Sequence, residues 1–254
     1  MNFKINSNQD ISEDILLDCI TNFEKSGEIL VIGNRNCIKI FKCNNTKIAI
    51  KSFKSPNFIN KIIYRYFRKS KAQRSFEYAS KLMELNIGTP KPVAFFEKYD
   101  LIGLKQSYYA CEHLENVFEF REIVQNIIFE NRELIIRKFI KFTFKMHQKG
   151  IEFLDHSPGN TLIKKENSAN YSFYLVDLNR MKFHKTLDFQ SRMKNLSRLT
   201  PQKEMIAIMS NEYAKLSGED EKKVFETMWK YTEDFQHSFH RKKRIKKKLK
   251  FWKK

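Results

Sequence analysis

The segment D-H-S-P-G-N-T-L-I, residues 155–163, gives the most direct clue to the architecture of this chain. Helical spacing of apolar residues over 132–149 ends shortly before it, and an apolar run over 161–164 closes it. Asp155 and Asn160 therefore lie five positions apart on a loop between a helix and a strand. A carboxylate that accepts a proton and an amide that holds a metal ion are two parts that phosphoryl transfer uses. The alternative is a loop in which both side chains only form turn hydrogen bonds.

A second acidic residue, Asp177, follows the apolar run at 174–176 and lies seventeen positions after Asn160. A carboxylate at the end of a hairpin that starts at Asn160 faces the same loop, where it suits Mg²⁺ between the β- and γ-phosphates of a nucleotide. We therefore predict that Asn160 and Asp177 are metal ligands. The alternative is that Asp177 is an ordinary turn residue at the end of a strand.

Lys51 is the predicted cation for the nucleotide phosphates. The run Ile48-Ala49-Ile50-Lys51 places it in an alternating strand among apolar neighbours. A lysine in the middle of a strand usually faces solvent, so this position alone carries little weight. Glu77 lies beside the apolar stripe of the helix predicted next, and an ion pair with Lys51 would aim the ammonium at phosphate. We therefore predict Lys51, Glu77 and Asp155 as catalytic residues; the alternative for Glu77 is an ordinary place on the helix surface.

The rest of the chain predicts a β-rich first part and a mainly helical second part. Short turns join three strand-like runs over 28–32, 37–41 and 47–53, which predicts an antiparallel meander. Apolar spacing and alternation further predict helices over 57–67, 71–85, 132–149, 201–216 and 220–237, and strands over 93–96, 101–112, 161–164 and 173–176. This layout is typical of an α+β, two-lobed, protein-kinase-like fold. We expect a small antiparallel β-rich lobe with one key helix over 1–113, a helical lobe with the catalytic loop over 114–239, and a disordered basic tail over 240–254.

Four motifs together resemble the lipopolysaccharide core kinase family, whose members phosphorylate Kdo or heptose on nascent lipid A–core. They are S-K-A-Q-R-S-F-E (70–77), N-I-G-T-P-K-P (86–92), D-H-S-P-G-N-T-L-I (155–163) and V-D-L-N-R-M-K-F (176–183). The resemblance covers about residues 28–200. It implies a phosphotransferase that uses ATP and Mg²⁺ and whose acceptor is a sugar hydroxyl of the lipid-linked lipid A–core.

The resemblance also implies where the nucleotide binds. ATP is expected between the two lobes, with its adenine on the strand that joins them, near Glu112, His113 and Leu114. Gly33 is expected in the turn that covers the phosphates, which Lys51 would also contact.

Three positions depart from the common kinase pattern. Phe153, two before Asp155, stands where kinases commonly carry His, and Asn179, two after Asp177, replaces the usual Gly. The phosphate-covering turn has a single glycine, so fewer backbone N–H groups face phosphate. None of these changes removes a predicted metal ligand or base, so the sequence favours an active enzyme over an inactive nucleotide-binding scaffold. A protein kinase or small-molecule phosphotransferase of the same fold is the other alternative, although no A-P-E segment follows Asp177.

The chain contains 48 Lys and Arg against 29 Asp and Glu, a formal net charge of +19. Ten of the cations and no acid lie in the tail, residues 240–254 (HRKKRIKKKLKFWKK). Cations interleaved with Ile245, Leu249, Phe251 and Trp252 suit an anionic membrane surface. The alternative is a solvated tail; nucleic acid is a less favoured partner, because no readout motif accompanies the tail.

Composition limits the remaining possibilities. The chain has 254 residues, of which 41% are hydrophobic, enough for one large domain or two small lobes. We find neither a signal-peptide pattern nor an apolar run that could span a bilayer, so we expect an intracellular protein, peripheral on the inner face of the cytoplasmic membrane. Because its four cysteines form no C-x-x-C pair, we expect isolated buried thiols in a reducing compartment rather than disulfides or a zinc site. They are Cys19, Cys37, Cys43 and Cys111.

Overall fold

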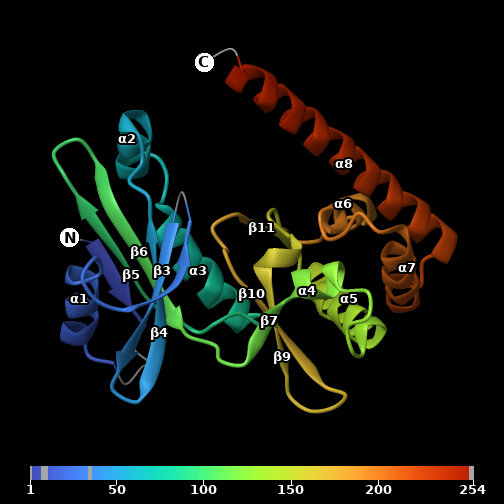
Figure 1. The fold of residues 1–254 in the computed structure, drawn as a ribbon, viewed down its shortest axis with the longest axis horizontal. Helices are drawn as coiled ribbons and strands as arrows, with labels where there is room; N and C mark the ends of the chain where they lie inside the picture. Colours follow the sequence, from blue (N-terminus) through green and yellow to red (C-terminus); the bar gives the residue numbers. More distant parts are fainter. Residues whose placement is uncertain (1, 7–10, 34–35, 252–254) are drawn as a thin grey trace. The chain divides into compact units, whose positions relative to one another are not determined.

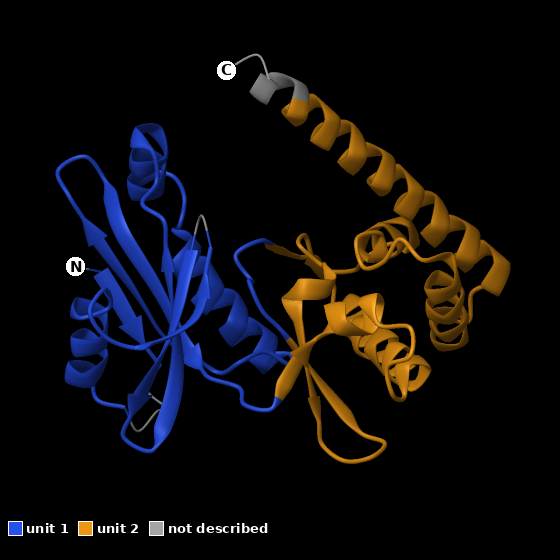
Figure 2. Ribbon diagram, in the orientation of Figure 1, with its two compact units in different colours: residues 1–116, 175–180 blue, residues 117–174, 181–254 orange. Residues whose placement is uncertain are grey.

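The computed structural model describes residues 2–6, 11–33 and 36–251, with side chains up to residue 247. Contacts divide the chain into two compact units (Figure 2). The first unit consists of residues 1–116 and 175–180, and the second of 117–174 and 181–254. The sequence placed the division after residue 113; the contacts place it after Asn116 and give the segment 175–180 to the first unit.

The first unit is built on one antiparallel sheet with the strand order β1-β5-β6-β4-β3-β2 (Figure 1). The predicted meander is confirmed as β2, β3 and β4, where short turns join strands rich in Val and Ile. The strands are β1 (Asn2–Ile5), β2 (Glu28–Ile32), β3 (Asn36–Cys43), β4 (Thr46–Phe53), β5 (Pro92–Tyr99) and β6 (Leu104–Glu112). The sheet therefore provides a rigid support for Lys51, which lies on a strand inside it.

Helices cover both faces of this sheet. In β5, Phe96 packs in the cluster that contains α1, whereas the ring of Phe95 packs at a tilt against Phe76 of α3, with ring centroids 5.5 Å apart. The same alternation in β4 puts Lys51 on the α3 side, opposite the buried face that packs on α1. The helices of this unit are α1 (Glu13–Thr21), α2 (Phe58–Tyr66) and α3 (Lys71–Glu84).

The second unit is mainly helical, with short strands around one loop. Its helices are α4 (Phe120–Gln125), α5 (Arg132–Gln148), α6 (Phe189–Leu196), α7 (Lys203–Ser217) and α8 (Glu221–Phe251), and a 3₁₀ turn, η1, spans Pro158–Asn160. Its strands are β7 (Val117–Glu119), β8 (Ile151–Phe153), β9 (Thr161–Lys165), β10 (Tyr171–Leu175) and β11 (Met181–Phe183). Strands β10, β9 and β7 form one sheet and β11 pairs with β8.

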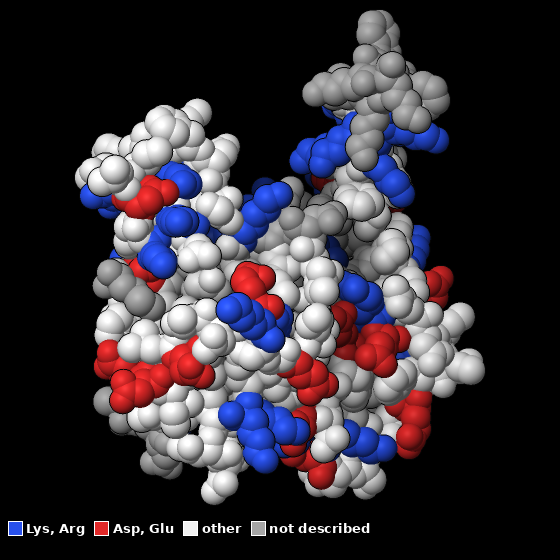
Figure 3. Space-filling model, turned by 60° about the vertical axis from the view of Figure 1, so that its left-hand side comes forward, with Lys and Arg blue, Asp and Glu red and all other residues white. Residues whose placement is uncertain are grey.

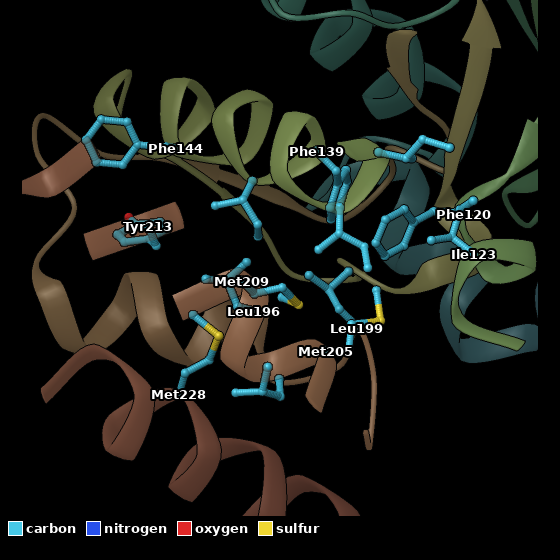
Figure 4. Packing of buried hydrophobic residues seen from close by; sticks show 14 of the residues in the cluster. Phe120, Ile123, Phe139, Phe144, Leu196, Leu199, Met205, Met209, Tyr213 and Met228 are labelled. Atoms are coloured by element: carbon cyan, nitrogen blue, oxygen red, sulfur yellow. The ribbon is translucent and has the colours of Figure 1, made fainter. Parts of the chain in front are cut away.

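One apolar core holds the helices of the second unit together (Figure 4). Phe120 of α4 stacks on Phe139 of α5, with ring centroids 4.0 Å apart, and Tyr213 of α7 meets Phe144 edge to face. Met228 brings α8 into the same cluster. Ring pairs of this kind add about 0.5–1.5 kcal/mol each beyond the burial of their area, so the core fixes the ends of α5 and α6 that flank the loop at 154–160.

The structure differs from the sequence expectation in the basic tail. The prediction ended a helix near residue 237 and left 240–254 disordered, whereas α8 continues through Phe251. Lys and Arg have high helix propensity and no Gly or Pro follows Gly218, so nothing in the sequence stops the helix. From His237 to Lys247 every side chain is exposed. Trp252, which the sequence placed with the tail's apolar residues, lies outside the described residues.

None of the described helices combines the length and the apolar character needed to cross a lipid bilayer.

The cysteines also differ from the expectation of isolated thiols. Cys19 of α1 and Cys43 of β3 are buried with their Sγ atoms 3.7 Å apart, and Cys37 and Cys111 are only partly buried. The pairing follows from the packing of α1 on the sheet, which no spacing in the sequence indicates.

Candidate functional site

In the first unit, Lys51 and Asp177 form an ion pair. Lys51 Nζ donates to Asp177 Oδ1 at 2.7 Å, and the two side chains are 14% and 36% exposed. The sequence predicted both residues as part of one site but did not predict that they touch. A lysine ammonium and a carboxylate in contact, both partly open to solvent, offer a cation for phosphate and an anion for a metal ion within one small region.

Hydrogen bonds to the backbone of Leu175 hold the segment 175–180 against the rest of the first unit. Leu175 N donates to Gly88 O at 2.9 Å, and the Thr89 hydroxyl donates to Leu175 O at 2.9 Å. Asp177 itself has a φ of +58°, in the left-handed region that few residues other than Gly, Asn and Asp adopt. This conformation turns its carboxylate to Lys51, and Asn179 Nδ2 donates to the same Oδ1 at 2.7 Å.

Asn179 therefore has a structural role where a kinase would usually have glycine. Its carbonyl oxygen accepts a hydrogen bond of 2.8 Å from Nη1 of Arg74, and Arg74 Nε donates to Ser70 O at 3.3 Å. Arg74 is 8% exposed, and burial, followed by the nearby charges of Arg68 and others, lowers its pKa. Sequence reasoning missed Arg74, because an arginine on an amphipathic helix normally faces water. It ties α3 to the loop that carries Asp177.

The predicted ion pair between Lys51 and Glu77 is not what the structure contains. Glu77 instead accepts two hydrogen bonds from Lys69 Nζ, at 2.7 and 2.8 Å, and one from Gln73 at 3.1 Å. Gln73 lies one helical turn before Glu77, and Lys69 directly precedes the N-cap of α3, so both partners are local in the sequence. The helix places Glu77 correctly near its apolar stripe, but helical spacing does not decide which cation comes closest.

The residues expected to bind the nucleotide also lie in the first unit. Glu112 ends β6, and its N–H donates to Lys91 O, while His113 N donates to Lys47 O, both at 2.9 Å. Leu114 follows in the connection that leaves the sheet. Gly33 directly follows β2, and its N–H donates to Asn36 O at 3.0 Å. No contact in the structure tests the adenine and phosphate roles of these residues, which stay predictions.

In the second unit, Asp155 and Asn160 share one short loop. This loop leaves β8, passes through η1 and enters β9. Asn160 Nδ2 donates to the backbone carbonyl of Asp155 at 2.8 Å, and Asn160 N donates to Ser157 O at 2.9 Å. The two residues are therefore held together as the sequence spacing indicated. Gly159 within the loop packs on Arg121, so that a Cβ at this position would clash with the guanidinium.

Arg198 is a second residue that the sequence did not reveal. Its Nη1 donates to Asp155 Oδ1 at 3.0 Å and to Leu154 O at 2.7 Å. The Arg198 guanidinium also lies over the ring of Phe235 in α8, at 5.4 Å. These contacts fix the orientation of the Asp155 carboxylate, which a base requires. No local sequence motif marks Arg198, because it approaches from a turn more than forty positions away.

Two buried histidines, His156 in the loop itself and His147 in α5, help to hold this loop in place. His156 lies between the rings of Phe139 and Phe153, at 5.6 and 5.8 Å, and burial lowers its pKa to about 4. Asn195 connects this region to α5, because its Nδ2 donates to Phe153 O at 2.8 Å and its Oδ1 lies 3.1 Å from His147 Nε2. Phe153, where kinases commonly carry His, is thus a core residue whose carbonyl anchors the loop.

The model of the lipopolysaccharide kinase (Kdo/WaaP) family matches residues 43–219, more than two-thirds of the chain, which includes Lys51, Asp155 and Asp177. The chain belongs to this family. It is therefore a kinase, a phosphotransferase that acts on sugar hydroxyls in lipopolysaccharide biosynthesis. The family that the sequence motifs resembled is confirmed.

A solved structure described as "WaaP in complex with acyl carrier protein" has the same fold as this kinase, with a TM-score of 0.64. The match covers 95% of this chain and 99% of that chain at 11% sequence identity. No curated protein matches the sequence. The protein-kinase-like fold expected from the sequence is therefore confirmed.

The predicted metal ligands have suitable chemistry for Mg²⁺. Asp177 offers a carboxylate, and Asn160 uses its Nδ2 on the Asp155 carbonyl, which leaves the amide oxygen as its atom for a cation. Mg²⁺ prefers such oxygen ligands and is usually held by one or two protein groups together with substrate phosphates. Among the described residues, no three His, Cys, Asp or Glu side chains gather closely enough to hold a metal ion by themselves.

Proposed function

We propose that this kinase transfers the γ-phosphoryl group of ATP, with Mg²⁺, to a hydroxyl of Kdo or heptose in lipid A–core. The family membership supplies the reaction class, and the Lys51–Asp177 ion pair is the observation that carries the proposal. A phosphoryl-transfer site needs a cation and a metal-binding anion on a stable support, and this pair sits on β4 and on a firmly anchored loop.

In this proposal the first unit handles the nucleotide. Lys51 contacts the phosphates, Gly33 lies over them, and Glu112, His113 and Leu114 contact the adenine. Asp177 holds Mg²⁺, which supplies charge neutralisation on the β- and γ-phosphates when bound. Lys51 is then expected to exchange its carboxylate partner for phosphate oxygens. This exchange needs little movement of Lys51, because its ammonium already lies 2.7 Å from the carboxylate that would hold the metal ion.

The second unit handles the acceptor. Asp155 accepts the proton of the sugar hydroxyl while that oxygen forms its bond to the γ-phosphorus and ADP departs with the electrons of the broken P–O bond. Arg198 holds the Asp155 carboxylate in one orientation, which supports the assignment of Asp155 as base. Asn160 supplies an amide oxygen to Mg²⁺ and fixes the loop through its bond to the Asp155 carbonyl.

We further propose that the kinase is cytoplasmic and works at the inner face of the cytoplasmic membrane, where a lipid-linked acceptor is accessible. The exposed end of α8 supports this location, because residues 240–254 carry ten cations and no acid. Each basic residue near an anionic membrane surface contributes about 1 kcal/mol. A cationic helix of this kind attracts acidic lipid without needing a spanning segment.

The direct test is an acceptor panel. Purified protein is incubated with labelled ATP and Mg²⁺, and with lipid A–core that ends in Kdo, lipid A–core that carries heptose, free sugars or a mixed-peptide substrate. Label in one of the two lipid A–core acceptors, and its loss when EDTA removes Mg²⁺, is the expected result. Transfer to peptide or to free sugar alone would support the other phosphotransferase classes, and ATP binding without any transfer would indicate a scaffold.

A further inference from the structure

Helix α2 is an amphipathic helix that turns its apolar side outward. Its apolar residues, Phe58, Ile59, Ile62, Ile63 and Tyr66, lie on one half of a helical projection, together with Phe67 just after the helix. In a globular protein such a stripe normally faces the core. Here none of the residues of α2 is buried, and Phe58, Ile59, Tyr66 and Phe67 are 63%, 68%, 66% and 82% exposed.

The helix is docked by its polar side. Lys61 Nζ donates to Asp100 Oδ2 at 2.7 Å, and Arg65 Nη1 donates to the carbonyls of Asp100 and Leu101 at 2.9 and 3.0 Å. The turn between β5 and β6 approaches so closely that a Cβ on Gly103 would overlap the carbonyl of Lys61. The outward apolar side is therefore a consequence of specific contacts on the other side of α2, and Figure 1 shows the helix beside this turn.

The same turn extends the apolar surface. Leu101 is fully exposed and Ile102 is 43% exposed at the tip of the β5–β6 hairpin. We call this surface the α2 patch: it comprises Phe58, Ile59, Tyr66, Phe67, Leu101 and Ile102. Figure 3 shows a largely uncharged prominence at the upper left, with Lys and Arg below it. Contiguous apolar surface with a polar rim marks an interaction site in a soluble protein.

The charges around the α2 patch indicate what it contacts. Lys98 and Lys105, on either side of the β5–β6 tip, are exposed. The nearest acid on the patch, Asp100, is already paired with Lys61, whose hydrogen bond lowers the pKa of this carboxyl to about 2. Arg65, Arg68 and Lys69 are exposed at the end of the helix. Exposed aromatic and aliphatic side chains with a mainly cationic border are typical of a helix that lies in the headgroup region of an anionic bilayer.

We propose that the α2 patch is a membrane-insertion surface, which lays α2 and the β5–β6 tip into the interface of an anionic lipid bilayer. This surface is separate from the basic end of α8 and does not depend on the identity of the phosphoryl acceptor. It differs from that tail in kind: the tail offers mainly charge, whereas the patch offers six apolar side chains that can enter the acyl boundary. Binding by the patch is therefore expected to survive salt that screens the tail.

The test uses full-length protein and vesicles of phosphatidylglycerol and phosphatidylethanolamine, without ATP or acceptor. The variant F58S/I59S/F67S changes only exposed side chains, and I127S/I128S is a matched control, because Ile127 and Ile128 are 75% and 91% exposed in the second unit. At high salt we expect the triple variant to bind about tenfold or more weakly than wild type, and the control to bind normally. Equal binding of wild type and triple variant would overturn the proposal.

A spectroscopic variant keeps the proposal testable if the triple variant folds poorly. Phe67→Trp adds an indole at an 82% exposed position. Its emission, taken as the difference from wild type, is expected to shift to shorter wavelength on vesicle addition and to be quenched by lipids brominated on the acyl chain. An unshifted and unquenched signal would overturn the insertion. So would a concentration-dependent dimer that the triple variant abolishes, because a second copy would then cover the patch.

Discussion

The ammonium of Lys51 and the carboxylate of Asp177 are in direct contact at 2.7 Å although 126 positions separate them in the chain. This contact joins the middle of a sheet strand to a loop that is also held through hydrogen bonds to the carbonyls of Leu175 and Asn179. The pair is partly open to solvent, so its net contribution to stability is small. Its predicted role is to place two opposite charges where a nucleotide and its metal ion would need them.

The first prediction concerns Asp177. Asp177→Asn removes the anionic ligand for Mg²⁺, and we expect Mg²⁺-dependent ATP turnover to fall by about 10²-fold or more, since removing one well-placed charged group typically costs that much. Initial rates across a Mg²⁺ titration measure the effect. Asp188→Asn is the control, because Asp188 caps α6 and asparagine caps equally well. A variant that stays within a few-fold of wild type would remove Asp177 from the metal site.

The second prediction separates Lys51 from Glu77. Lys51→Met removes the cation for the phosphates and should lower turnover by about 10²-fold, with a raised KM for ATP. Glu77 pairs with Lys69 at the surface, and such pairs contribute about 0–1 kcal/mol, so Glu77→Gln should change turnover by less than about fivefold. Steady-state kinetics of both variants, with Lys54→Met as a control at an exposed lysine, measure this. A large loss in Glu77→Gln would indicate that Glu77 changes partner to Lys51 during turnover.

The third prediction concerns the base. Asp155→Ala should slow transfer to the sugar by about 10²–10⁴-fold, the range for a missing general base, because the variant lacks the carboxylate assigned to accept the hydroxyl proton. Nucleotide affinity should stay within a few-fold, since the nucleotide contacts are assigned to the first unit. Single-turnover transfer and equilibrium nucleotide binding are measured on the same preparation. If binding is lost while the rate per bound nucleotide is unchanged, Asp155 is a binding residue.

The fourth prediction is a pH dependence of stability. Burial lowers the pKa of His147 to about 3 and that of His156 to about 4, below the ordinary value of about 6.5. At a pH below about 6.5 and above these lowered pKa values, the histidines of the unfolded chain bind protons that the buried histidines of the folded chain do not. The free energy of unfolding should therefore fall as the pH drops from about 6.5 toward 4, by roughly 1.4 kcal/mol per pH unit for each histidine.

Urea unfolding from about pH 4.5 to 7.5 measures this slope. His156→Phe keeps an aromatic ring between Phe139 and Phe153 and should reduce the slope by the share of one histidine. The comparison with wild type cancels the contribution of the carboxylates, which titrate in both proteins. An identical slope in the two proteins would show that His156 does not stay neutral in the folded state.

The fifth prediction concerns the exposed end of α8. Deletion of residues 241–254 should remove the salt-sensitive part of the binding to anionic vesicles, while transfer to a soluble acceptor stays near that of wild type. The deleted end contains only exposed positions among its described side chains, so its removal leaves the core intact. Co-sedimentation across a salt series measures the first part. Loss of soluble-acceptor activity on truncation would mean that α8 supports the catalytic loop beyond the contact of Phe235 with Arg198.

Sequence reasoning located the elements that carry their own local signals. The β2–β4 meander follows from its turn residues, and α3 and α5 follow from their apolar spacing and their ends. It did not predict β1 or α1, whose short, mixed sequences acquire regular structure only by packing on β5 and β3. The continuous α8 was missed because charge was weighed above helix propensity.

The same distinction applies to the site. Lys51, Asp155, Asn160 and Asp177 were predicted from their spacing relative to strands and loops, and their catalytic and metal-binding roles stay predictions. Arginines such as Arg198 leave no such signal, because their role depends on a partner that only the fold brings close. The error over Glu77 has the same cause: periodicity fixes the face of a helix but not the ion pair that forms there.

The segment 175–180 has a consequence for the order in which the protein can fold. The first unit ends at residue 116 except for this segment, which arrives only after the whole of 117–174 has been made. During synthesis at about 5–20 residues per second, the interval between residues 116 and 180 is roughly 3 to 13 s. The sheet can form early, because it needs nothing from the later chain.

Throughout that interval the nascent chain exposes Arg74 and Lys51 without the carbonyl of Asn179 and the carboxylate of Asp177. A released fragment that stops at residue 116 would have the same two unmatched cations permanently. Completion of the first unit is thus coupled to emergence of most of the second unit from the ribosome. A chain that stops at residue 116 consequently lacks Asp177, the predicted metal ligand.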